Sequence, residues 1–260
     1  MPKIVRFHQI GGPDVLKIVE EPLVSPKEGE VRLRVHALGL NRAEAMFRSG
    51  AYLEVAQLPS RLGYEAAGVV DAIGPGVSSV KIGDRVSTIP AFGLSAHGVY
   101  GESAVVPAFA VAPYPEHFTP EQGSAVWMQY MTAWIGLLER GQLQKGQTVL
   151  ITAASSSVGL AAIQIAKAMG ATTIAVTRKA AKKTRLLEAG ADHVVVTDQE
   201  ELPARVAAVS DGQGANLIFD PVSGPYVETL AQAAAHGARL IIYGLLDMRP
   251  TPFPLFPAFQ

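Results

Sequence analysis

Residues 149–159 read Val-Leu-Ile-Thr-Ala-Ala-Ser-Ser-Ser-Val-Gly, and an apolar pattern at helical spacing follows from Leu160 to Lys167. The run of β-branched and apolar residues predicts a buried strand, and the small residues after it allow a tight turn into the helix. Strand, tight turn and helix form the first unit of a dinucleotide-binding fold. In that unit, backbone N–H groups and the helix dipole hold a pyrophosphate.

The glycine fingerprint of this unit is incomplete. The first two glycines of the pattern fall on Ala154 and Ser156, and only Gly159 is present. Alanine and serine are small enough for close packing but less tolerant of unusual backbone angles, and serine adds hydroxyl donors. A parallel βα unit without a ligand is the alternative. The predicted cofactor-binding residues of the turn are Ala154, Ser155, Ser156, Ser157, Val158 and Gly159.

The second strand ends in positive charge. Residues 172–176 read as a strand, and a helical stretch over 180–189 is ended by a glycine. An NAD-binding fold usually places an acid after this strand to bind the ribose 2′-hydroxyl, whereas an NADP-binding fold places cations there. The sequence instead has Thr177, Arg178 and Lys179, followed by Lys182. Arg178 can grip a phosphate in a planar fork and Lys182 can act as a point charge. A solvated basic helix start is the alternative, but such a start opposes the helix dipole. We therefore favour NADPH over NADH.

Further strand signals alternate with helices. Strands are predicted at 193–196, 217–219 and 239–243, with helices around 202–209 and 226–235. This alternation predicts a doubly wound parallel sheet, whose ligands sit beyond the carboxyl ends of the strands. The residues at those ends are taken as cofactor-binding, although each alone could equally be ordinary turn chemistry. They are Asp220, Val222, Tyr243 and Gly244.

The first part of the chain differs. Short alternating stretches separated by Gly and Pro turns predict a β-rich domain, with strands such as 30–38, 66–73 and 85–89 and a short helix near 42–47. Prolines cluster between 113 and 120, and a helical region over 121–140 leads onward. We therefore expect an α/β protein of two domains, residues 1–115 and 116–260.

Several strings occur in a family order. They are Gly39-Leu40-Asn41, residues 48–52, residues 62–70 with the pattern Gly63-x-Glu65-x-x-Gly68-x-Val70, Gly83-Asp84-Arg85-Val86, Thr132-Ala133-Trp134, residues 153–159, residues 188–192 and residues 220–224. On these strings the chain resembles the zinc-free quinone oxidoreductase branch of the medium-chain dehydrogenase/reductase superfamily. The resemblance implies a GroES-like β-barrel domain followed by a Rossmann domain, with the active site between them.

The zinc ligands of the related alcohol dehydrogenases are missing. The chain has no cysteine, Tyr64 stands where their zinc-binding histidine would be, and Asn41 lies near their first cysteine. Zinc sites need thiolate, imidazole or carboxylate ligands at set spacing, so no metal site is expected. The resemblance then implies hydride transfer from NADPH to a quinone or to the β-carbon of an α,β-unsaturated carbonyl.

Negative charge that develops on the substrate oxygen calls for a hydrogen-bond donor. Tyr52 and Asn41 match family positions beside the nicotinamide and are the candidate catalytic donors. Their alternatives are an aromatic packed on the barrel and a turn residue satisfying its own backbone. Thr132 matches a position that touches the nicotinamide. The expected substrate pocket comprises Tyr64, Met128 and Tyr130.

The chain is shorter than its family. Members usually continue with a sixth strand and return to the first domain, whereas this sequence ends in an apolar, proline-rich stretch over 253–260. The chain is either a fragment of a longer enzyme or a C-terminally shortened family member. Family members often dimerise through the sixth strand, and its loss would expose an edge strand, so the family's homodimer and full activity are both doubtful. A reductase of simple aldehydes or ketones, and a truncated cofactor-binding protein with little turnover, are the alternative functions.

Composition limits the classes of partner that the protein is expected to bind. A net charge of −1 gives no reason to expect nucleic acid or membrane surfaces, and no apolar run reaches spanning length. The absence of cysteine fits a reducing compartment, and the start of the chain lacks a signal-peptide pattern. A cytoplasmic protein with a small carbonyl or quinone substrate is expected.

Overall fold

The computed structural model describes residues 1–259, which form two compact units, Met1–Met128 and the part of the chain from Gln129 onward. The division falls inside helix α4 (Trp127–Trp134), downstream of the proline cluster. The domain boundary at residues 115 and 116 stays a prediction. Each unit has its own buried apolar clusters, as independent domains require.

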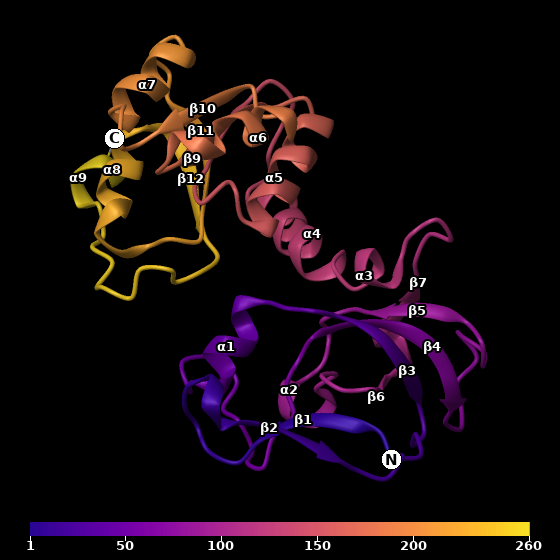
Figure 1. Cartoon of the computed structure of the whole chain (residues 1–260). Helices are drawn as coiled ribbons and strands as arrows, with labels where there is room; N and C mark the ends of the chain where they lie inside the picture. Colours follow the sequence, from indigo (N-terminus) through magenta and orange to yellow (C-terminus); the bar gives the residue numbers. More distant parts are fainter. Residues whose placement is uncertain (260) are drawn as a thin grey trace. The chain divides into compact units, whose positions relative to one another are not determined.

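The first unit is built on a five-stranded antiparallel sheet in the order β6-β3-β4-β5-β7 (Figure 1). Its strands are β3 (Glu30–Gly39), β4 (Glu65–Ile73), β5 (Arg85–Thr88), β6 (Ser103–Pro107) and β7 (Val111–Pro113). A separate hairpin pairs β1 (Lys3–Phe7) with β2 (Leu16–Glu20). The short helices are α1 (Arg42–Arg48), α2 (Leu94–His97) and α3 (Pro120–Gly123), with 3₁₀ turns at Pro13–Val15 and Ala108–Ala110.

Alternation along the strands explains the barrel core. In β3, Val31 and Leu33 are fully buried while Arg32 and Arg34 face outward, which is the two-residue period of a half-buried strand. The buried side chains of β3 meet those of β4 and β6 in one apolar cluster. The strands predicted at 30–38, 66–73 and 85–89 and the helix at 42–47 are thereby confirmed to within one residue at each end.

The second unit is a five-stranded parallel sheet in the order β10-β9-β8-β11-β12. The strands are β8 (Thr148–Ile151), β9 (Thr172–Thr177), β10 (His193–Val196), β11 (Ala215–Asp220) and β12 (Ala234–Ile242). The chain order reverses between β8 and β11, so the sheet has a topological switch point there. The predicted α/β class and doubly wound parallel sheet are confirmed.

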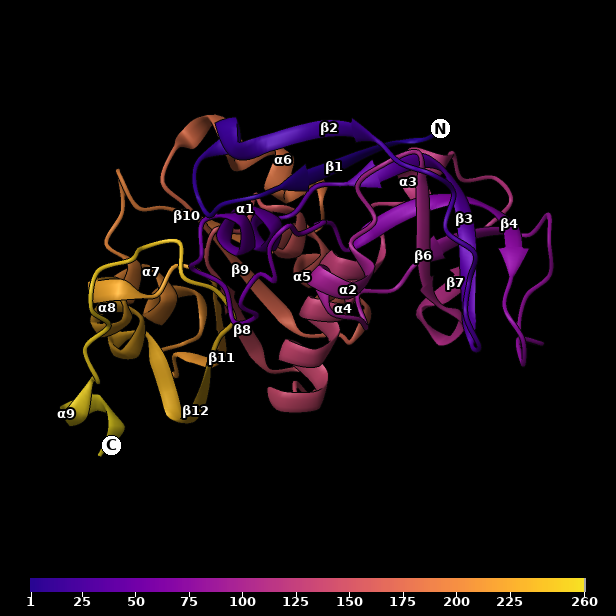
Figure 2. The same cartoon turned by 90° about the horizontal axis from the view of Figure 1, so that it is seen from below.

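Helices cover both faces of this sheet (Figures 1 and 2). Helix α4, a π-helical turn over Ile135–Arg140, helix α5 (Ser157–Ala168) and helix α6 (Lys183–Glu188) pack on one face. Helices α7 (Leu202–Val209) and α8 (Val227–Gln232) pack on the other. Short 3₁₀ turns over Ala180–Lys182 and Gly224–Tyr226 precede α6 and α8, and α9 spans Leu255–Ala258.

One boundary prediction was wrong. The helix expected over 226–235 ends at Gln232, and β12 already begins at Ala234. The pairing of β12 with β11 then jumps, because Ala215 pairs with Ala234 while Leu217 pairs with Arg239. Gly237 sits in this bulge with φ of 68°, a conformation that glycine adopts without strain. The run of alanines before it reads as helix in sequence, which is why the strand start was missed.

No helix among residues 1–259 combines the length and the apolar character needed to span a bilayer.

Candidate nucleotide-binding site

A pocket of about 730 Å³ lies at the carboxyl ends of the parallel strands. Every strand of the second unit contributes the segment that follows it, as expected for a ligand site of a doubly wound sheet. The lining residues are Thr152, Ala153, Ser155, Ser156, Val176, Thr177, Arg178, Lys179, Lys182, Thr197, Val222, Tyr226, Leu246, Asp247, Met248 and Arg249. Six predicted cofactor-binding residues are thus brought together here: Ser155, Ser156, Thr177, Arg178, Lys182 and Val222.

The turn between β8 and α5 is tightly built. Ala153 has φ of 43°, an uncommon conformation for a residue with a side chain, and Ala154 is fully buried. A side chain at Gly159 would place its Cβ 2.5 Å from the carbonyl oxygen of Ala154. Gly159 is therefore required for the helix to approach the turn. Ala154 and Ser156 replace the first two glycines of the fingerprint, and the turn remains tight. Ala154 and Gly159 shape the turn rather than line the pocket.

The first turn of α5 offers free donors. Ser156 is the N-cap, and its hydroxyl accepts a hydrogen bond from the N–H of Gly159 at 3.1 Å. Among residues 1–259, the backbone N–H groups of Ser157 and Val158 have no hydrogen-bond partner. Free N–H groups at the start of a twelve-residue helix, together with the positive end of its dipole, form a site for an anion.

Positive charge gathers after β9. Arg178 and Lys182 are exposed, and neither side chain makes an ion pair or hydrogen bond with any described residue. Lys179 lies between them in sequence but is paired with Asp198, its Nζ 2.6 Å from the carboxylate. Sequence reasoning found no acid near this cluster and missed Asp198, which follows β10. Two free cations remain beside the pocket.

Asp220 is buried and turned inward. Its carboxylate accepts hydrogen bonds from the Thr152 hydroxyl, from the Val222 N–H at 3.2 Å and from the Ser223 N–H at 2.7 Å. These bonds join β8 to the turn after β11, where Ser223 has φ of 58°. The carboxylate is buried, holds three donors of the chain and does not line the pocket, so its position supports the turn-chemistry alternative, while Val222 lines the pocket.

The segment after β12 was missed by sequence reasoning. Leu246 and Asp247 donate their N–H groups to the carbonyls of Pro221 and Val222, at 3.0 and 2.9 Å, and so lay the segment along the turn after β11. Asp247 is held by Arg249, whose Nη2 lies 2.6 Å from Oδ2. These hydrogen bonds lower the pKa of Asp247 to about 2. No motif marks these residues, and only the fold brings them to the pocket.

Tyr243 follows β12. Its ring stacks on Phe219 with centroids 4.0 Å apart, and its hydroxyl is buried. Burial raises the pKa of the phenol, and the Ser156 side chain beside the hydroxyl opposes that shift. Neither Tyr243 nor Gly244 lines the pocket, so a ligand contact by either residue stays a prediction.

In the first unit, Asn41 is tied to two buried glutamates. Its side-chain N–H donates to Glu65 at 3.0 Å, and its backbone N–H donates to Glu44 at 2.7 Å. Glu44 also accepts the N–H of Tyr64 and Glu65 accepts the N–H of Met128. Burial raises the pKa of both carboxyl groups. Glu44 carried no sequence signal, whereas Glu65 belongs to the Gly63-x-Glu65-x-x-Gly68 string.

The remaining candidates fall into two groups. Tyr52, Tyr64 and Met128 belong to one apolar cluster of the first unit, with the rings of Tyr52 and Tyr64 6.4 Å apart. Tyr130 and Thr132 lie on α4 in the second unit, and the Tyr130 hydroxyl donates to the Gln164 side chain of α5 at 2.5 Å. Packing accounts for Tyr52, and an internal hydrogen bond accounts for the Tyr130 hydroxyl.

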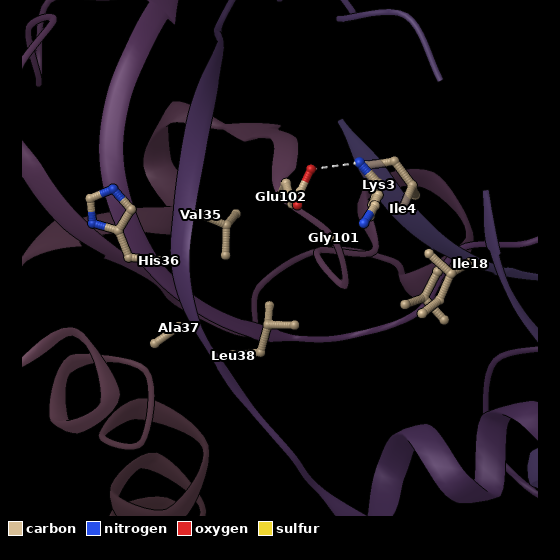
Figure 3. Close-up of a pocket in the computed structure, with 10 residues that line it drawn as sticks. Lys3, Ile4, Ile18, Val35, His36, Ala37, Leu38, Gly101 and Glu102 are labelled. Carbon is tan, nitrogen blue, oxygen red and sulfur yellow. Dashed lines mark hydrogen bonds between the residues drawn. The ribbon is translucent and has the colours of Figure 1, made fainter. Parts of the chain in front are cut away.

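A second cavity of about 410 Å³ lies in the first unit between β1, β2 and β3 (Figure 3). It is lined mainly by aliphatic side chains, and the Lys3 N–H donates to the Glu102 carboxylate at its edge. It contains none of the predicted site residues. Within residues 1–259, no three His, Cys, Asp or Glu side chains are grouped so that they could hold a metal ion.

Comparison with known proteins agrees with this architecture. The model of the alcohol dehydrogenase GroES-like domain matches residues 27–116, and that of the zinc-binding dehydrogenase matches residues 157–260. Human quinone oxidoreductase is 32% identical over 93% of this chain and 73% of its own length. The structure of Escherichia coli quinone oxidoreductase complexed with NADPH superposes with a TM-score of 0.86 at 30% identity, covering 98% of this chain and 76% of that one.

Two domains of this kind, with a pocket at the switch point of the second, define the medium-chain dehydrogenases and reductases. The chain belongs to the quinone oxidoreductase branch of that superfamily. The rat synaptic vesicle membrane protein VAT-1 homolog is 33% identical over 93% of this chain but over only 59% of its own length. The chain therefore spans about three fifths of the length of this relative.

Proposed function

We propose that this chain is an NADPH-dependent, zinc-free oxidoreductase that transfers hydride to a quinone or to the β-carbon of an α,β-unsaturated carbonyl. The observation that carries the proposal is the pocket of the second unit, which is lined by Ser156, the N-cap of α5, and by the cations Arg178 and Lys182, whose side chains have no partner among residues 1–259. The free N–H groups of Ser157 and Val158 follow Ser156 directly. Relatives named quinone oxidoreductase, one of them complexed with NADPH, support the same assignment.

The residues fit a nicotinamide dinucleotide phosphate. The N–H groups of Ser157 and Val158 and the hydroxyl of Ser155 would bind the pyrophosphate. Arg178 and Lys182 would bind the 2′-phosphate, because a guanidinium fork and an ammonium match its geometry and charge. Val222 and Thr177 would border the ribose rings. When bound, the cofactor supplies the hydride, and the protein supplies orientation and an anion-stabilising field.

On the substrate side, Tyr52 is the stronger candidate for a donor to the developing oxyanion. Its hydroxyl shares a hydrogen bond with the Tyr64 side chain, and burial together with this bond raises the pKa of Tyr64, whereas one N–H of the Asn41 amide is held by Glu65. Asn41 would then donate through its second N–H, in an orientation that Glu65 fixes. Thr132 remains proposed as a contact of the nicotinamide, and Tyr64, Met128 and Tyr130 remain proposed as substrate-pocket residues.

Oxidation of NADPH by purified protein tests the function. We expect the NADPH absorbance to fall with a quinone or an enone as acceptor, and to fall more slowly with simple aldehydes and ketones. The same rate with the chelator EDTA present would support chemistry without a metal. Faster turnover of simple aldehydes than of quinones and enones would instead favour the carbonyl reductase alternative. Tight NADPH binding with no oxidation by any acceptor would favour a binding protein with little turnover.

A further inference from the structure

Arg249 is a fourth cationic residue of the pocket lining, after Arg178, Lys179 and Lys182, and the family strings do not include it. It follows β12, lines the pocket with Asp247 and projects its side chain so that 71% of it is exposed. Its Nε and Nη2 are both bonded to the Asp247 carboxylate, at 3.0 and 2.6 Å. Nη1 makes no hydrogen bond to any residue between 1 and 259. The guanidinium is thus fixed on one edge and free on the other.

The strand order places Arg249 and Arg178 on opposite sides of the β8–α5 turn. Arg178 follows β9, which is one neighbour of β8, while the segment that carries Arg249 is hydrogen-bonded to the turn after β11, the other neighbour of β8. With strands about 4.8 Å apart, the ends of β9 and β11 are separated by about 10 Å. A dinucleotide carries its pyrophosphate in the middle and its 2′-phosphate at the adenosine end. The free anion site of α5 lies between the two arginines.

Building on the proposed function, we propose that Arg249 is a pyrophosphate-binding residue, held in place by Asp247. The Asp247 carboxylate binds the guanidinium through its Nε–Nη2 edge, which leaves the Nη1 edge unbonded in a residue that lines the pocket. The segment itself is anchored, since Asp247 N–H donates to Val222 at 2.9 Å and Gly224 N–H donates to the Thr251 hydroxyl at 2.9 Å. Arg249 therefore binds the pyrophosphate, which NADPH and NADH share, whereas Arg178 binds the 2′-phosphate, which only NADPH carries.

Binding titrations with ligand fragments separate these roles. Arg249→Ala is expected to weaken NADPH, NADH and ADP-ribose by the same factor, about three- to tenfold given the exposure of the side chain, and to leave adenosine 2′-monophosphate unchanged. Arg178→Ala is expected to weaken NADPH and adenosine 2′-monophosphate but not NADH. Lys145→Ala is the matched control, because it removes an exposed positive charge that precedes β8, at the amino-terminal ends of the strands and away from the pocket.

Loss of Arg249 also exposes the bare Asp247 carboxylate, which repels any phosphate. The Asp247→Asn background removes that repulsion. Adding Arg249→Ala to Asp247→Asn is expected to weaken ADP-ribose at least threefold further if the guanidinium contacts the pyrophosphate. Equal ADP-ribose affinity in the single and double variants would overturn the proposal. Circular dichroism on each variant verifies that it is folded, and Arg249→Lys should bind with intermediate affinity.

The two proposals fail differently. Wild-type protein that is folded but takes up none of these ligands contradicts the proposed function itself. Wild-type protein that prefers NADPH, with unchanged affinities in the Arg249 variants, contradicts only the role of Arg249.

Discussion

Two polar clusters of this protein use their hydrogen-bonding groups in opposite ways. At the pocket of the second unit, the Arg178 guanidinium and the N–H groups of Ser157 and Val158, which follow the pocket-lining Ser156, have no partner among residues 1–259. Around Asn41, the described donors converge on the buried carboxylates of Glu44 and Glu65. The donors of the first cluster are free to bind a ligand. The donors of the second cluster hydrogen-bond within the chain and connect α1 and the start of α4 to the sheet of the first unit.

The same contrast separates the residues at the carboxyl ends of the parallel strands. Asp220 lies at a strand end, where ligand-binding residues are expected, yet its carboxylate is fully engaged by Thr152, Val222 and Ser223. A position at the ligand edge therefore does not make a side chain a ligand contact. What distinguishes the two kinds of residue is whether the folded chain has already satisfied their polar atoms.

The largest expected effect is the loss of stability when the hydrogen-bonded carboxylate of Asp220 is removed. Asp220→Ala removes the acceptor of two backbone N–H groups and a hydroxyl in a fully buried site, which should lower the free energy of unfolding by about 4 kcal/mol. Urea denaturation followed by fluorescence measures it. Asp220→Asn keeps one acceptor and should cost about half as much. A loss below about 1 kcal/mol for Asp220→Ala would show that these bonds do not hold the turn.

Gly159→Val tests the shape of the anion site. Its Cβ would meet the backbone of Ala154 at 2.5 to 2.7 Å, so the turn must move. We expect a loss of about 3 kcal/mol in stability and loss of NADPH binding, since overpacking displaces the donors. Ser157→Ala is the control: it removes an exposed hydroxyl and keeps the backbone N–H. Retained NADPH affinity in Gly159→Val would contradict the role of the turn.

Arg178→Ala sharpens the comparison without disturbing the fold. The side chain is exposed and unpaired, so its removal should leave thermal unfolding unchanged. We expect the Kd for NADPH to rise about thirtyfold and that for NADH to rise less than twofold. Fluorescence titration measures both. Equal weakening of the two cofactors would refute the assignment of the 2′-phosphate to Arg178.

The smallest effect concerns the buried carboxyl of Glu65. Burial raises its pKa in the folded state above the unfolded value, so the folded form binds the proton more tightly. This contribution to stability is present at acidic pH and is lost as the pH rises through the raised pKa, with a slope of at most about 1.4 kcal/mol per pH unit.

Urea denaturation of Glu65→Gln and of the wild type from about pH 4 to about pH 8 isolates the contribution of Glu65 to the free energy of unfolding. Wild-type stability relative to Glu65→Gln should be highest at the acidic end and should decrease with pH. A difference that grows with pH would mean that the Asn41 and Met128 hydrogen bonds outweigh burial.

Sequence predicted the elements that follow strong periodicity. The β8–α5 unit, the parallel strands and the basic end of β9 were all readable, because strand and helix periods and the charge of Arg178 are local signals. The early start of β12 was not, since alanines at 233–235 fit a helix locally and only pairing with β11 makes a strand of them.

Long-range partners lay beyond the sequence. Asp198 joins Lys179 from the next strand, and Asp247 and Arg249 reach the pocket only because their segment hydrogen-bonds to the turn after β11. Glu44 gave no signal, because a glutamate in the first turn of a helix is usually an exposed cap. Such groups are recognised by what they touch in three dimensions, and no spacing rule encodes that.

Titration calorimetry of the folded wild-type chain with NADPH and with NADH tests the central claim most directly. The free donors of α5 and the free cations after β9 predict that both cofactors bind to one site per chain and that NADPH binds at least about tenfold more tightly. Absence of heat with either cofactor, or tighter binding of NADH, would contradict the account.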